Sequence, residues 1–155
     1  QVESGGDINA WRVEPHYRYL WDVSRAAPFR RLTTEERRSE HAPSDFPHYG
    51  HSSRNTEFWG QQSSWGPMQI MGAVAREHGF RQPFPALCTH AYGVLYGAIH
   101  LASLRNRFLQ NYGWEGVAAA YNAGSPRRRE DGRWENQGYV DKLSANRAFE
   151  FERIG

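Results

Sequence analysis

The sequence predicts a mostly α-helical, single-domain protein that carries a long, irregular insertion. Its 155 residues are the length of one domain and suffice to bury a core. Hydrophobic residues make up 39% and aromatic residues 14% of the chain, too many for a disordered protein. In the second half, apolar residues recur every three or four positions, as in an amphipathic helix. We therefore expect one domain over residues 1–155.

The N-terminal segment is interpreted as the end of a helix followed by the insertion. Gly5 and Gly6 can adopt the left-handed conformation that ends helices, so we expect Glu3 in a last helical turn whose upstream part precedes this chain. Residues 10–62 lack regular apolar spacing and contain four prolines. They form the predicted insertion, with short helices at 34–40 and 55–62.

Longer helices are predicted after the insertion, at 68–78, 85–113, 114–123 and 139–152. Three of them end beside a glycine, namely Gly79, Gly113 or Gly124. The second should be the central core helix, because it has one apolar face, formed by Leu87, Ala91, Val94, Leu95, Ala98, Leu101 and Ala102.

Charge and composition disfavour several classes of partner. The formal net charge is only +2, and the densest basic run, 127–129, is followed at once by Glu130 and Asp131, which is typical of a solvated turn. We therefore expect no nucleic-acid partner. No apolar run approaches the roughly 20 residues of a membrane-spanning helix. Cys88 is the only cysteine, which excludes an internal disulfide and suggests a buried thiol.

No metal or cofactor is expected. One loop of the insertion contains potential zinc ligands, but their spacing matches no zinc signature and solvated side chains are the simpler interpretation. These residues are His41, Asp45, His48 and His51. The charged run 35–38 is interpreted as a solvated helix face.

Three short segments carry the functional signal, and they occur in a fixed order. They read Glu3-Ser4-Gly5-Gly6, Gly66-Pro67-Met68-Gln69-Ile70 and Ala119-Ala120-Tyr121-Asn122-Ala123-Gly124, followed by Tyr139-Val140. In this order they resemble the motifs of SLT-type lytic transglycosylases, relatives of goose-type lysozyme. The resemblance covers residues 2–143 apart from the insertion, and it implies a lysozyme-like fold that cleaves peptidoglycan glycan strands. Pro67 stands where the family has Leu, and the link from Gly6 to Gly66 is unusually long.

The resemblance implies a role for each motif residue. Glu3 would be the catalytic acid, and Tyr121 would hydrogen-bond near its carboxyl group. Ser4, Met68, Gln69 and Asn122 would bind or support the substrate. From its own position before Gly66, Trp65 is expected to stack on a sugar ring, whereas Trp11, Trp59 and Trp114 are interpreted as packing residues.

The chemistry of glycoside cleavage agrees with this assignment of Glu3. The leaving oxygen needs a proton, and a carboxyl group supplies one near neutral pH only if burial raises its pKa, for example against Met68 and Tyr121. Ordinary glycosidases use a second carboxylate. Asp7 is the nearest candidate, but an Asp after two glycines is typical of a turn. A lytic transglycosylase, as the resemblance implies, needs one carboxyl group and leaves a 1,6-anhydro sugar.

Other functions stay open from the sequence. The same scaffold could hydrolyse the glycan as a muramidase, cut chitin, or serve as a non-catalytic glycan-binding module of a virion or secretion machine. The arginine-rich chain and the long insertion favour a phage-encoded enzyme that acts on the cell wall or periplasm, as part of a larger virion or cell-wall-penetrating protein.

Overall fold

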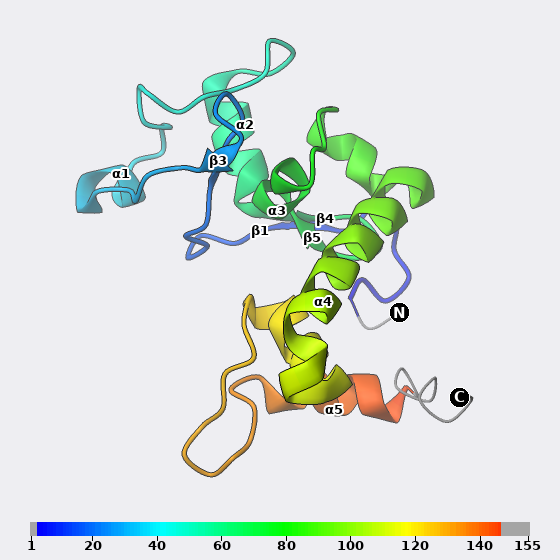
Figure 1. The fold of residues 1–155 in the computed structure, drawn as a ribbon. Helices are drawn as coiled ribbons and strands as arrows, with labels where there is room; N and C mark the ends of the chain where they lie inside the picture. Colours follow the sequence, from blue (N-terminus) through cyan, green and yellow to red (C-terminus); the bar gives the residue numbers. More distant parts are fainter. Residues whose placement is uncertain (1–2, 147–155) are drawn as a thin grey trace. The chain divides into compact units, whose positions relative to one another are not determined.

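A computed structural model describes residues 3–146 and divides them into two compact units, residues 3–97 and 98–146. Figure 1 shows the helices and strands of the chain. Helices exceed strands in these residues, so the expected helical character is confirmed only in this coarse sense. The elements are β1 (Trp11–Val13), β2 (Trp21–Asp22), β3 (Ala27–Pro28), α1 (Thr34–Arg38), α2 (Arg54–Gln61), β4 (Ser63–Trp65), β5 (Ile70–Met71), α3 (Gly72–Glu77), a 3-10 helix (Phe84–Cys88), α4 (His90–Ala123) and α5 (Gln137–Ala145).

A small antiparallel sheet organises the first unit. Its strand order is β1-β4-β5, with Trp11 opposite Trp65 and Trp65 opposite Ile70. The sheet joins the start of the expected insertion to the residues that follow it. Strands β2 and β3 form a separate hairpin. None of these strands was predicted from the sequence.

The expected insertion, residues 10–62, contributes its own buried cluster. Leu20, Phe46 and Phe58 are each at most 2% exposed. The ring of Phe46 meets those of Phe29 and Phe58 edge to face, at centroid distances of 4.9 and 5.2 Å. The insertion is therefore a packed part of the first unit and less irregular than predicted.

A second buried cluster lies outside the insertion and includes Ile70, Val74, Ala75, Phe80, Phe84 and Leu87.

The second unit contains the C-terminal part of α4 and helix α5. Gly113 interrupts α4 with a non-helical backbone, φ 63° and ψ −174°. This confirms the predicted break between helices at 85–113 and 114–123. Leu104, Val117 and Ala120 form one buried cluster, and Ala119, Trp134 and Val140 form another. Helix α5 starts at Gln137, two residues before the predicted start, and the predicted residues 147–152 lie outside the described part of the chain.

Two predictions of local structure were wrong, and a third is tested only in part. Residues 3–6 form turns with the expected left-handed glycines, whereas residues 1–2 of the predicted helix end lie outside the described part of the chain. Helix α3 begins only at Gly72, because residues 66–69 make a turn with a positive φ at Gln69 and residues 70–71 pair as β5. The predicted apolar face of α4 is largely exposed, since Val94 and Leu95 are 44% and 50% accessible.

No helix among residues 3–146 is long and apolar enough to span a membrane.

Candidate functional site

Glu3 lies in a partly buried turn at the start of the first unit. The Ser4 hydroxyl accepts a hydrogen bond from the Gly6 N–H at 3.2 Å, and the Ser4 carbonyl accepts one from the Asp7 N–H at 3.1 Å. Gly5 and Gly6 have φ values of 66° and 93°, which favour glycine. Ser4 therefore stabilises the turn that holds Glu3. Asp7 forms the expected turn, in which its carboxylate accepts from the Asn9 N–H at 2.8 Å.

The segment that follows the first motif is joined to the second motif at the carbonyl oxygen of Ala10, next to the pairing of β1 with β4. This oxygen accepts hydrogen bonds from the Gly66 N–H at 2.7 Å and from Nε2 of Gln69 at 3.0 Å. Ala10 and Gln69 are 59 positions apart in the chain. The loop that carries Glu3 is thus anchored on the Gly66–Gln69 turn, and this contact bridges the whole insertion.

The amide of Gln69 is committed to this turn. Besides Ala10, its Nε2 donates to the Gly66 carbonyl at 2.9 Å, and its Oε1 accepts from the Ser64 hydroxyl at 3.0 Å. Both amide hydrogens are therefore used inside the protein. Gln69 also has a φ of 46°, an unusual value for a residue other than glycine. These contacts give Gln69 a positioning role, and its predicted sugar contact remains a prediction.

Pro67 and Met68 pack on glycines of α4. A methyl group at Gly93 would come within 2.6 Å of Pro67 Cδ, and one at Gly97 within 2.5 Å of Met68 Cβ. Both approaches are too close for any residue with a Cβ. Pro67, which stands where the SLT-type motif has Leu, thus packs closely against Gly93 of α4. The same packing explains why the glycine face of α4 is buried while Val94 and Leu95 are exposed.

Trp65 is the central ring of an aromatic stack. It stacks with Trp11, its cross-strand partner, at 5.8 Å and with Phe84 at 5.7 Å, and its Nε1 donates to the Gly60 carbonyl at 2.9 Å. Trp65 is partly buried, whereas Trp11 is 60% exposed. Both tryptophans and Phe84 line an apolar groove of about 410 Å³.

Trp11, which the sequence indicated as a packing residue, is the more exposed ring of this stack, and sugar stacking by Trp65 remains a prediction. The Trp65 ring is stacked against both Trp11 and Phe84, which leaves little of it accessible. Trp11 is therefore the better exposed ring for stacking on a sugar. The two rings are cross-strand partners on one face of the sheet, but Trp11 lies on the edge strand β1 and Trp65 on the central strand β4. Strands of three residues give too little alternation to reveal this from the sequence.

The third motif lies in the second unit. Tyr121 is partly buried beside Leu104, Val117 and Ala120, and its ring lies 5.4 Å from that of His100. Asn122 is exposed, and its Oδ1 accepts a hydrogen bond from Nδ2 of Asn136 at 2.9 Å. Because Glu3 belongs to the other unit, an approach of Tyr121 to Glu3 remains a prediction.

Asn136 and His100 were both missed from the sequence. Asn136 also donates to the Ala119 carbonyl at 3.0 Å, so it ties the α5 cap to the end of α4. The signal that could have indicated Asn136 is its place just before α5, where asparagine is favoured. His100 carries no local sequence signal, because its position beside Tyr121 depends on how the helices pack.

No protein-family model matches this chain, and neither a curated protein nor a solved structure matches it. The resemblance to SLT-type lytic transglycosylases therefore rests on the three ordered motifs of the sequence.

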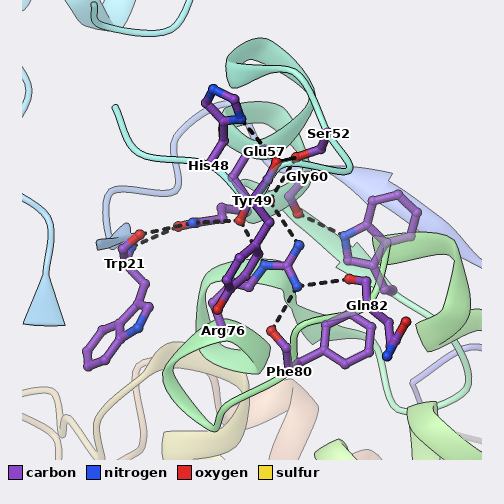
Figure 2. Close-up of polar contacts among 11 residues, drawn as sticks. Trp21, His48, Tyr49, Ser52, Glu57, Gly60, Arg76, Phe80 and Gln82 are labelled. Atoms are coloured by element: carbon purple, nitrogen blue, oxygen red, sulfur yellow. Dashed lines mark hydrogen bonds and ion pairs between the residues drawn. The ribbon is translucent and has the colours of Figure 1, made fainter. Parts of the chain in front are cut away.

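The first unit contains a buried ion pair, and its arginine, Arg76, lines the same groove as Trp11 and Trp65. Glu57 of α2 and Arg76 of α3 have fully buried side chains and meet in two hydrogen bonds of 2.8 and 2.9 Å. Figure 2 shows the Arg76 guanidinium also donating to the carbonyl oxygens of Phe80 and Gln82. Gln61 binds Glu57 at 3.1 Å and exchanges hydrogen bonds with the Trp21 backbone. This network holds α2 against α3, and it was not predicted from the sequence.

The loop of potential metal ligands is engaged in other contacts. Asp45 binds Arg30 through two hydrogen bonds of 2.6 and 2.7 Å, which lower the pKa of its carboxyl group. The His51 ring stacks with Tyr49, and His48 Nδ1 lies 3.1 Å from the Tyr49 carbonyl oxygen. Within residues 3–146 no three His, Cys, Asp or Glu side chains are grouped so that they could hold a metal ion.

Proposed function

We propose that this protein cleaves the glycan strands of peptidoglycan as a lytic transglycosylase, with Glu3 as its general acid and base. One observation carries the proposal. The Ala10 carbonyl, four residues after the first motif, accepts hydrogen bonds from Gly66 and Gln69, so the chain that follows Glu3 is held on the second motif.

The proposed reaction uses one carboxyl group twice. Protonated Glu3 first donates its proton to the oxygen between N-acetylmuramic acid and N-acetylglucosamine, and the C1–O bond breaks. The resulting carboxylate then takes the proton of the muramic acid C6 hydroxyl, whose oxygen bonds to C1. The product is a 1,6-anhydro sugar, and Glu3 is protonated again. The roles of Tyr121 and Asn122, which lie in the second unit, rest on the motif resemblance alone.

Ser4 and Gln69 act as positioning residues in this scheme. Ser4 holds the turn of Glu3, and Gln69 holds the turn on which that loop is anchored. Met68 packs against Gly97, and its place in the sugar cleft is what the resemblance implies. The protein would act in the cell wall or periplasm, as part of a phage-encoded, cell-wall-penetrating assembly.

The test is mass spectrometry of the soluble products from purified peptidoglycan. We expect muropeptides that end in 1,6-anhydromuramic acid. Glu3→Gln should lower the rate by about a hundred- to ten-thousandfold, as for removal of a general acid. The control is Glu130→Gln, an exposed carboxylate in the second unit, which should keep the rate. Reducing ends would instead identify a hydrolase, and an active Glu3→Gln variant would refute the role of Glu3.

A further inference from the structure

A second groove lies in the first unit, formed by the insertion. It encloses about 760 Å³, and four arginines line it, namely Arg18, Arg31, Arg37 and Arg38. All four are exposed, and none of them forms an ion pair with any part of the chain that the structure describes. Arg37 and Arg38 occupy the last turn of α1.

The charge balance of this groove is positive. Two carboxylates, Glu36 and Glu40, face four arginines in its lining. Glu36 is also bound by Arg30 through hydrogen bonds of 2.7 and 2.8 Å, which lower the pKa of its carboxyl group to about 2. Glu36 therefore stays ionised and paired with Arg30, so it does not neutralise the lining arginines.

The groove also has a fixed wall of aromatic side chains. Trp59 is partly buried, and its Nε1 donates to the Glu40 carbonyl at 3.1 Å. Tyr17 is partly buried too, and burial raises the pKa of its hydroxyl, which stays protonated. Among residues 3–146 that hydroxyl forms no hydrogen bond, so it is an available donor in the lining. A capping box formed by Thr33 and Glu36 stabilises α1, which carries two of the arginines.

We propose that this groove binds the carboxylates of a peptide, and that the peptide is the stem attached to the glycan. Guanidinium groups pair with planar carboxylates through two parallel hydrogen bonds, and a neutral hydroxyl can add a third donor. The glycan itself is largely uncharged, whereas the stem peptides carry several carboxylates. The identification of the peptide rests on the proposed function, while the preference for carboxylates follows from the groove.

Calorimetric titration with a free stem tetrapeptide tests the proposal. The tetrapeptide should bind, and its methyl ester should bind at least tenfold more weakly. The double variant Arg37→Gln/Arg38→Gln should weaken tetrapeptide binding at least tenfold. Its matched control, Arg54→Gln/Arg81→Gln, removes two exposed charges outside the groove and should stay within twofold of the parent protein. Circular dichroism of each variant checks that it is folded, and Arg31→Gln provides a second, single-site test.

Equal binding of the ester, or unchanged binding by Arg37→Gln/Arg38→Gln, would overturn the proposal. Tighter binding of a single-stranded oligonucleotide than of the tetrapeptide would overturn it too. The tetrapeptide contains no glycosidic bond, so its binding is independent of glycan cleavage. Binding without cleavage would refute the proposed function alone, and cleavage without tetrapeptide binding would refute this inference alone.

Discussion

Arg76 and Glu57 form a bidentate ion pair with both side chains fully removed from solvent. Two carbonyl oxygens accept from the same guanidinium, and the Phe84 ring lies 4.1 Å from its central carbon. A buried charge pair is costly to desolvate and is tolerated only when its hydrogen bonds are complete. Because the hydrogen bonds of this buried pair are complete, removing one partner should leave the other charge buried and uncompensated and so lower the stability of the protein.

Glu57→Gln should destabilise the protein by about 3–5 kcal/mol, because Arg76 would keep its charge in a buried site without a carboxylate. Arg76→Lys should also destabilise it, since an ammonium group cannot reproduce the two parallel bonds. The free energy of unfolding in urea measures both effects. As a control, Glu135→Gln removes an exposed partner of Arg127 and should cost less than about 1 kcal/mol. A loss for Glu57→Gln as small as that of the control would contradict the buried pair.

The sequence predicted helices well and strands not at all, for a physical reason. Capping residues and periodicity are local signals, so α2 was placed within one residue and the break at Gly113 was found. The strands are two or three residues long, and β1 pairs with a segment more than fifty residues away. Such short strands show no alternation, and their pairing depends on the whole first unit.

The sequence indicated candidate site residues by type but did not indicate their contacts. The order of the motifs indicated Glu3 and Gln69, yet nothing local shows that the Gln69 amide is used inside the protein. The exposed face of α4 was mistaken for the core face because Gly93 and Gly97, which pack against the Gly66–Gln69 turn, carry no hydrophobic signal. Close backbone approach is a property of two segments, and a scan of one segment cannot detect it.

Gly97→Ala should disturb the site through packing. Its new methyl group would lie 2.5 Å from Met68 Cβ, which is close to the backbone and cannot swing away. We expect a loss of about 1–3 kcal/mol in unfolding free energy and a lower rate of glycan release. Gly138→Ala is the control, because its methyl group would meet nothing within 4 Å in α5 and should stabilise the helix slightly. Equal stability of the two variants would argue against the close packing of Met68 on α4.

Trp11→Ala and Trp65→Ala should have different effects. Trp11 is 60% exposed, so its removal should cost only about 1 kcal/mol of stability but weaken binding of a soluble chito-oligosaccharide by roughly three- to tenfold. Trp65 is held by two rings and by the Gly60 carbonyl, so Trp65→Ala should cost about 3 kcal/mol or more. Denaturation and titration of both variants separate the roles. If Trp11→Ala binds the sugar like the parent protein, the exposed ring is not a sugar platform.

The unfolding free energy should fall as the pH drops below about 6.5. His78 is half-buried, and burial lowers its pKa from the usual 6.5, against the opposite effect of Glu77. In this window the unfolded chain binds more protons at His78 than the folded protein, so stability is lost as the pH falls towards the folded pKa. His78→Gln should reduce the slope between pH 7 and 5.5, measured by urea denaturation. The exposed substitution His90→Gln is the control and should keep that slope.

Alkylation of Cys88 tests whether the loop that carries Glu3 and Asp7 lies close to Cys88. Burial raises the pKa of the thiol, the Gly66 backbone N–H acts in the opposite direction, and the charge of Asp7 raises it further. Since the thiolate is the reactive form, Cys88 should react with iodoacetamide at pH 8 more slowly than a short cysteine peptide.

Asp7→Asn should speed that reaction roughly two- to fivefold, because it removes a nearby negative charge and lowers the thiol pKa. The asparagine oxygen can still accept from the Asn9 N–H, so the turn should persist. Asp131→Asn, an exposed carboxylate in the second unit, should leave the rate unchanged. If Asp7→Asn behaves like Asp131→Asn, Asp7 does not lie near Cys88. The Ala10 anchor, which holds the same loop on Gly66, would then lose its support, and so would the joining of the first two motifs.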